Sequence, residues 1–161
     1  MNKDAIILTV ALCLGSMILE LFGTSKNGKK WFESLKQPKY SFPFFVWYFV
    51  GGLYYLMCGI IAYRLFAGKI NNNFIVVMIL LILMMLFNGL TNFLLFKAKS
   101  IRLFYYSIYP FSLIVMTLFA LLIGTDRISA WILFPYLVWL IYDIYYFRGL
   151  WKLNLPVTGN Y

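Results

Sequence analysis

The chain has 161 residues, of which 63% are hydrophobic and 12% charged, and Lys and Arg outnumber Asp and Glu by 14 to 5. Soluble domains are roughly half apolar and a quarter charged, and a chain of this length has too small an interior to bury so much apolar surface. The composition therefore excludes a soluble protein and indicates an integral membrane protein. Histidine is absent, which removes the usual general base, haem ligand and zinc ligand, so we expect neither a metal site nor a required cofactor.

Five apolar runs are long enough to cross a bilayer, which takes about 20 residues. The loops between them leave no room for a soluble domain, so residues 1–161 predict one all-α domain, a bundle of five transmembrane helices. The first run contains Glu20 and lacks a convincing small-residue cleavage site, so we interpret it as a helix of the mature protein and not as a signal peptide. The expected helices cover about residues 5–22, 44–67, 74–96, 103–124 and 129–153.

The basic residues predict the orientation of this bundle. With five spans, most of them fall on one side, and the positive-inside rule places that side, with the C-terminus, in the cytoplasm and the N-terminus outside. This pattern suits a bacterial inner membrane as well as a eukaryotic organelle membrane. Because charges that flank membrane helices explain the net charge of +9, we expect a lipid bilayer and not a nucleic acid as the partner. The cytoplasmic set is Lys26, Lys29, Lys30, Lys36, Lys39, Lys97, Lys99, Arg102, Arg148 and Lys152.

The first helix carries small residues and one acid. Gly15 and Ser16 would let a neighbouring helix approach closely. We expect Glu20 to reach the interface or to pair with a connector lysine, because ionisable groups near helix ends usually reach water. Cys13 and Cys58, at mid-helix positions, are expected to be apolar packing residues.

The connector between the first two helices is too aromatic and too rich in proline to be an ordinary polar loop. Pro38 and Pro43 bias the residues before them away from helix. Its large side chains need an apolar surface, so we predict a structured connector that covers part of the bundle as a lid would. These side chains are Trp31, Phe32, Leu35, Tyr40 and Phe42.

The second helix has an aromatic face interrupted by glycine. Trp47, Gly51, Tyr54 and Tyr55 recur at three- and four-residue steps and share one face. A cleft at Gly51 flanked by aromatic rings would admit a flat ligand. Close helix packing through the glycines of this helix is the alternative. Those glycines are Gly51, Gly52 and Gly59.

Polar residues interrupt the third and fourth helices. Asn88 and Asn92 are costly in a membrane span unless they bond across the bundle or contact a ligand, and both roles stay open. Pro110 frees a carbonyl within the fourth helix, which often happens beside a cavity. Residues 71–73, three asparagines, predict a tight turn.

The fifth helix carries an aromatic stripe with an acid inside it. Tyr136, Trp139, Asp143 and Phe147 follow helical spacing. Such stripes are more often packing than binding sites, but an acid at membrane depth is expensive and indicates a functional site. Asp143 is expected to be protonated, bonded to Asn88 or Asn92, or facing a wet pocket.

These motifs, in register over most of the chain, resemble the translocator protein or TspO family. Trp31, Leu35, Pro38 and Pro43 fit its W-x-x-x-L-x-x-P motif, which leads into the second helix. Further matches are Tyr55, Gly59, Tyr63, Asn88, Pro135 with Tyr136 and Trp139, and Trp151 with Asn154.

The resemblance implies a five-helix bundle, commonly a homodimer, with a pocket that opens toward the cytosolic side under the first connector. It implies binding of porphyrins such as protoporphyrin IX or haem, of benzodiazepine-type ligands and, in animal members, of cholesterol. Light-dependent porphyrin breakdown in bacterial relatives is attributed to two pocket tryptophans, on the second and fifth helices. A proposed cholesterol pattern, of low specificity, is met by Leu140, Tyr142 or Tyr146, and Arg148.

The chain departs from the family pattern at three positions. Trp139 matches the tryptophan of the fifth helix, but Gly51 stands where the second helix has one, and Trp47 lies one turn earlier. Asp143 stands where the family usually has alanine. Ser107 stands at the position early in the fourth helix where the family often has an acid.

We therefore expect a membrane protein that holds a flat apolar ligand, a porphyrin or a sterol-like molecule, within its bundle, for transport or for stress sensing. Binding is expected in preference to catalysis, since no acid–base pair or nucleophile supports other chemistry. The alternatives are light-dependent porphyrin degradation, with Trp139 as the redox residue, and small-molecule transport that uses Asp143. The expected ligand-binding residues are Trp31, Phe32, Leu35, Pro38, Pro43, Trp47, Gly51, Tyr54, Tyr55, Asn88, Asn92, Tyr136, Trp139, Tyr142 and Asp143.

Overall fold

The structure, a computed structural model, describes residues 2–68 and 73–155. Over these residues it is all helical, with five helices long and apolar enough to cross a membrane, so the predicted all-α five-helix bundle is confirmed. Most of the turn predicted at residues 71–73 lies outside the described residues; Asn73 precedes the third long helix.

The five long helices run close to the predicted ranges, and a sixth, short helix lies in the connector. The last turn before Lys97 is π-helical and is named η1. The elements are α1 (Lys3–Gly23), α2 (Lys26–Glu33), α3 (Phe44–Ala67), α4 (Phe74–Asn92), η1 (Phe93–Lys97), α5 (Ile101–Thr125) and α6 (Arg127–Leu153).

Polar side chains mark where several helices begin. Asn2 accepts a hydrogen bond from the backbone N–H of Asp4 at 3.1 Å, and Ser25 accepts one from that of Gly28 at 2.9 Å. Ser100 caps α5 and Asp126 caps α6 in the same way. Such caps satisfy backbone donors that the first turn of a helix leaves unpaired.

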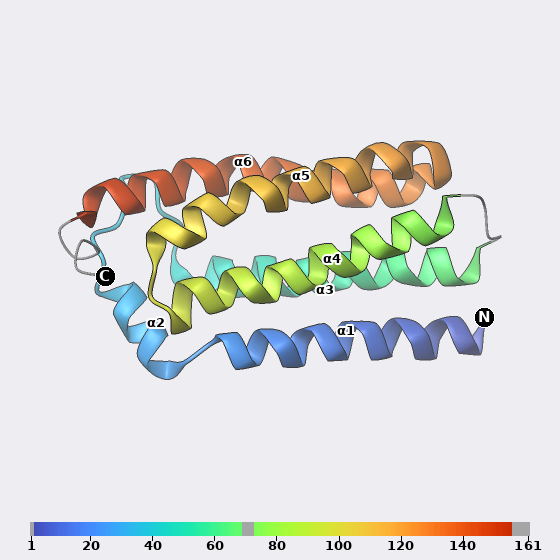
Figure 1. Cartoon of the computed structure of the whole chain (residues 1–161), viewed down its shortest axis with the longest axis horizontal. Coiled ribbons are helices and arrows are strands. Elements are labelled where there is room, and N and C mark those ends of the chain that lie inside the picture. The colour runs from blue at the N-terminus through green and yellow to red at the C-terminus, as the bar shows by residue number, and fades with distance from the viewer. Residues whose placement is uncertain (1, 69–72, 156–161) are drawn as a thin grey trace.

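The long helices surround a common interior. In Figure 1, α1 lies along one edge of the bundle, α5 and α6 lie along the opposite edge, and α3 and α4 run between them. Helix α1 packs against α4, α4 against α5, α5 against α6, α6 against α3, and α3 against α1. The five helices therefore close around the interior. The connector helix α2 lies at one end, here called the connector end; the end where α5 turns into α6 is the distal end.

Two buried clusters fill the bundle on either side of that interior. The distal cluster packs α3 to α6 through fully buried side chains such as Ile61, Leu81 and Leu118. The connector cluster joins α2 to η1, α5 and α6 through Phe32, Leu95 and other residues. The remaining members of the connector cluster are Leu35, Ile101, Tyr105, Ile108, Tyr146, Phe147 and Leu150.

The glycines show where helices meet and where they part. A Cβ on Gly59 would lie 3.5 Å from Cys13 Sγ, so α1 and α3 pack closely there, and both cysteines are free packing residues as expected. A Cβ on Gly51 would have no neighbour within 4 Å, nor would one on Gly15. The prediction of close helix packing at Gly15 was therefore wrong. At Gly51 the structure has the predicted open cleft, and the alternative of helix packing does not apply there.

Candidate functional site

A cavity of about 710 Å³ lies between the two clusters, beneath the connector, and side chains from every helix line it. Its walls are mainly apolar and aromatic, and its volume falls in the range of about 300–1,000 Å³ typical of small-molecule sites. Pro110 lies in α5 between Ile108 and Phe111, which line the cavity. Ten expected binding residues also line it: Phe32, Trp47, Gly51, Tyr54, Tyr55, Asn88, Asn92, Tyr136, Trp139 and Asp143.

The cavity is open on one side, between the connector-end halves of α1 and α3. Met17 and Leu21 from α1 and Tyr48 from α3 line it and are 43%, 70% and 62% exposed. These helices pack closely at Gly59, whereas the space beside Gly51 is empty. The opening therefore lies on the lateral surface of the bundle, next to the connector.

Two tryptophans form the wall between α3 and α6. The rings of Trp47 and Trp139 meet edge to face, with their centroids 5.4 Å apart. Trp47 also contacts Tyr146 and Phe147, at 5.0 and 5.8 Å. Gly51, one turn beyond Trp47, leaves open space beside them. The wall thus offers aromatic faces next to a volume that a flat molecule would fill.

A group of tyrosines lines the part of the cavity nearer the distal cluster. The rings of Tyr54 and Tyr136 lie 5.0 Å apart, and those of Tyr54 and Tyr55 lie 5.3 Å apart. The hydroxyl of buried Tyr54 donates to the carbonyl oxygen of Met84 at 3.2 Å. Because α3, α4 and α6 all take part, this group fixes their relative positions.

Glu20 points into the bundle and not toward water. Its Oε2 accepts hydrogen bonds from the Tyr55 hydroxyl at 2.5 Å and from Asn88 Nδ2 at 3.1 Å. The expected contact with the interface or with a connector lysine is therefore wrong. Two donors on facing helices offset the desolvation of the carboxylate, which a single membrane helix could not do.

Asp143 is not bonded to either asparagine. The Asn88 amide donates to Glu20, and Asn92 Nδ2 donates to the Asn88 carbonyl oxygen at 3.1 Å. The carboxyl of Asp143 interacts with the indole of Trp139, one turn earlier, but its buried Oδ1 has no hydrogen-bond partner. The expected bond to an asparagine is therefore wrong, the orientation toward a pocket fits the geometry, and the protonated state stays a prediction.

The connector helix α2 covers the cavity. Phe32 turns inward and contacts the rings of Phe44 and Phe96 at 5.9 and 5.7 Å. The Lys29 ammonium lies 5.0 Å from the centre of the Phe44 ring and 3.9 Å from Glu33. With Lys26, which also lines the cavity, it makes this side basic.

The remaining expected binding residues hold the connector or support it and do not line the cavity. Pro38 packs on Gly149, where a Cβ would come within 3.2 Å of its ring. The Tyr142 hydroxyl donates to the Tyr40 carbonyl oxygen at 3.1 Å and accepts from Phe42 N–H at 3.3 Å. Leu35 belongs to the connector cluster, Trp31 packs on it and Pro43 precedes α3.

Two further anchors of the connector were not predicted as such. Asn154, at the end of α6, accepts from Lys36 N–H and donates to the Lys36 carbonyl oxygen, both at 3.0 Å. The Tyr146 hydroxyl donates to Gln37 Oε1 at 2.6 Å. Asn154 matched the resemblance as part of a motif, but a contact between residues 118 positions apart has no local signal in the sequence.

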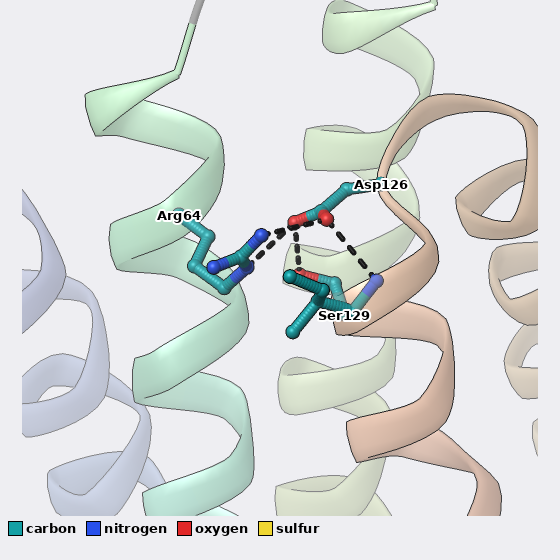
Figure 2. Close-up of polar contacts among 4 residues, drawn as sticks. Arg64, Asp126 and Ser129 are labelled. Atoms are coloured by element: carbon teal, nitrogen blue, oxygen red, sulfur yellow. Dashed lines mark hydrogen bonds and ion pairs between the residues drawn. The ribbon is translucent and has the colours of Figure 1, made fainter.

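A polar cluster closes the distal end of the bundle, as Figure 2 shows. Arg64 donates to both carboxylate oxygens of Asp126, at 2.7 and 2.8 Å, and the Ser129 hydroxyl donates to Asp126 at 2.6 Å. Chiefly because of the Arg64 hydrogen bond, the pKa of Asp126 is lowered to about 2. This cluster ties the end of α3 to the turn between α5 and α6.

Five membrane-spanning helices around an aromatic cavity, closed at one end by a connector, define a multi-pass membrane protein with an internal site. Residues 7–152 match the TspO/MBR family, so the chain belongs to this family, and the resemblance carried by its motifs is confirmed. No curated protein sequence matches the chain significantly.

Proposed function

We propose that this protein binds a flat, largely apolar ligand, first of all a porphyrin, in the cavity beneath the connector. The observation that carries the proposal is the pair Trp47 and Trp139 beside the open space at Gly51. Aromatic faces bind planar rings by stacking. Family membership supports the same ligand class.

The charges around the cavity suit an amphiphilic ring. Lys26 and Lys29 lie where the cavity meets the connector, and would attract carboxylates on the rim of a porphyrin. In the proposed topology the connector and the C-terminus face the cytoplasm. The ligand then lies in the cytoplasmic half of the bundle, and a homodimer is the proposed assembly.

Removing the Trp139 ring tests this site. Protoporphyrin IX is titrated into the purified protein in detergent, and the shift of the porphyrin Soret absorbance gives the affinity. Trp139→Ala is expected to weaken binding about 5- to 150-fold, since loss of one stacking ring costs about 1–3 kcal/mol in comparable sites. Trp131→Ala is the matched control, because Trp131 lies on α6 outside the cavity and is 69% exposed.

Equal affinities for the two variants would contradict the proposed site. Absence of saturable binding by the native chain would contradict the ligand class. A Gly51→Trp variant sharpens the second result. Binding that appears only in that variant would mean that the native cavity has been reshaped for another ligand.

Light-dependent degradation of a bound porphyrin is the second candidate, and the contact between Trp47 and Trp139 favours it. Trp139 would then act as the redox residue. Loss of porphyrin absorbance under illumination separates this activity from binding alone. A Trp139→Phe variant that reacts as fast as the native protein would remove the role proposed for Trp139.

A sterol at the α6 surface has less support. Leu140 and Tyr146, two residues of the cholesterol pattern, are buried in the bundle. They do not present a continuous lipid-facing surface together with Arg148, so a sterol is not part of the main proposal.

A further inference from the structure

Two carboxylates face the cavity from opposite edges of the bundle. Glu20 belongs to α1 and Asp143 to α6, and both line the cavity. Tyr136 lies within electrostatic range of both side chains. Over residues 2–68 and 73–155, the ion pairs are Lys29 with Glu33 and Arg64 with Asp126, so neither cavity acid is neutralised by a basic side chain.

The two acids differ in how well their oxygens are satisfied. Glu20 is held by donors from Tyr55 and Asn88, so its position is fixed by the protein itself. The Oδ1 atom of Asp143 is buried and has no hydrogen-bond partner, and the residue lines the cavity. A buried acceptor without a partner is destabilising, and a donor supplied by a ligand would remove that cost.

Aromatic residues flank the unsatisfied acid along α6. Trp139 lies one turn before Asp143 and Phe147 one turn after it, and all three line the cavity together with Trp47. Ring faces attract cations, most strongly where water is excluded. A positively charged or N–H-bearing ring system would therefore meet an acceptor and several π faces at once.

Basic side chains line the cavity where it meets the connector. Lys26 and Lys29 belong to the connector, and Lys29 is held over the rings of Phe44 and Tyr48. The cavity thus has a basic side under the connector and an acidic interior. This polarity orients a ligand that carries both kinds of group.

We propose, on the basis of the ligand-binding function proposed above, that the cavity selects flat aromatic nitrogen compounds that carry a cationic nitrogen or an N–H donor. Asp143 is the specificity-determining acceptor. Glu20, fixed by Tyr55 and Asn88, provides a second negative site. Anionic substituents of the ligand point toward Lys26 and Lys29.

A pair of flat dyes tests the selection directly. 9-Aminoacridine is protonated at neutral pH, whereas acridine has nearly the same ring area and is neutral. We expect the native protein in neutral detergent to bind 9-aminoacridine at least about tenfold more tightly than acridine, as measured by dye fluorescence. Asp143→Asn keeps the side-chain size but cannot carry a negative charge. It should lower the ratio of affinities most of the way toward one, by weakening the binding of 9-aminoacridine and not that of acridine.

Asp4→Asn is the matched control, since Asp4 is an exposed acid at the start of α1, outside the cavity. It should leave the ratio unchanged. Competition by protoporphyrin IX assigns the dye to the cavity. Glu20→Gln, whose side chain keeps its neighbours Tyr55 and Asn88, is expected to lower the ratio less than Asp143→Asn does.

The outcomes separate this inference from the proposed function. Saturable porphyrin binding without a preference for 9-aminoacridine, or a preference that survives Asp143→Asn, overturns the role of Asp143 and leaves the proposed function standing. If neither porphyrin nor dye binds, the proposed function itself fails. Should Asp143→Asn not fold, the ratio measured on the native chain decides, and equal affinities for the two dyes overturn the inference.

Discussion

The two ends of the bundle treat their charged residues in opposite ways. At the distal end, Arg64 and Asp126 satisfy each other with two short hydrogen bonds, and Ser129 adds a third (Figure 2). At the connector end, Asp143 keeps a buried oxygen without a partner. A polar group that is fully paired indicates structure, whereas an unpaired one beside a cavity indicates a place for a ligand.

The packing of side chains also differs between the two ends. Side chains of the distal cluster, such as Leu118 and Leu122, are fully buried with no accessible surface. Toward the connector, α1 and α3 separate beside Gly51, and the cavity opens between them. The distal cluster is therefore tightly packed, whereas beneath the connector the bundle leaves a cavity that opens between α1 and α3. Three substitutions test this difference between the two ends.

Gly28→Ala should have the largest effect, and it acts at the connector end. A Cβ on Gly28 would overlap the main-chain carbonyl of Phe96, so α2 must move away from η1. We expect a loss of about 3 kcal/mol or more in stability, in the range of severe backbone clashes. Thermal unfolding in detergent and the rate of tryptic cleavage at the connector lysines measure it.

Gly15→Ala is the control for this substitution, because a Cβ there meets nothing within 4 Å. It should be neutral or stabilising by up to about 1 kcal/mol, since alanine favours helix over glycine. Unchanged melting and cleavage in Gly28→Ala would mean that α2 does not depend on close contact with η1.

Asp126→Asn should have the next largest effect, confined to the distal end. Losing the charge-assisted bonds from Arg64 is expected to destabilise the protein by about 2 kcal/mol, while the affinity for a cavity ligand stays the same. Thermal unfolding and a porphyrin titration measure the two quantities separately. A fall in affinity without a loss of stability would show that the distal end affects the cavity, and would contradict the difference proposed between the two ends.

The pH dependence of stability checks the same pair. The pKa of Asp126 is lowered to about 2 in the folded protein, below the value of about 3.9 of an unperturbed aspartate. The stabilisation is therefore complete above about pH 4 and is lost as the pH falls toward 2. Asp126→Asn should lack this component of the acid-induced loss, and identical acid profiles for the two proteins would contradict the assignment.

Tyr146→Phe should have the smallest effect. It removes the hydrogen bond to Gln37 but keeps the ring against Trp47. We expect a loss of about 1 kcal/mol in stability and a faster dissociation of bound ligand, measured by stopped flow, because the connector is held less firmly. Tyr145→Phe is the control, since Tyr145 is the preceding residue and is 57% exposed. Equal dissociation rates would show that this bond does not hold the lid.

The features that could be predicted from the sequence are local ones. Five hydrophobic runs of sufficient length specify five spans. Helical spacing placed Trp47 and Gly51 on one face and Trp139 and Asp143 on another, and in the structure these residues line one cavity. Proline and aromatic residues indicated a structured connector, although its helix α2 was not expected.

The features that could not be predicted depend on how the helices are rotated and paired. Glu20 lies one turn from a helix end, where such residues usually reach water, but the packing of α1 turns it toward Tyr55 and Asn88. Arg64 and Asp126 are 62 residues apart, so nothing local to either one indicates the other. Gly15 and Gly59 look alike in the sequence, yet only Gly59 faces a helix at close range.

The two hydrogen bonds between Asn154 and the main chain of Lys36 also determine the order in which parts of the protein can assemble. The chain is synthesised from its N-terminus, so the connector emerges long before the end of α6, to which it is bound. The earlier helices can enter the membrane and associate while the connector is still unattached. Fastening the lid is thus a late step of biogenesis, and a chain that ends before Asn154 would insert its helices yet leave the connector without this attachment to α6.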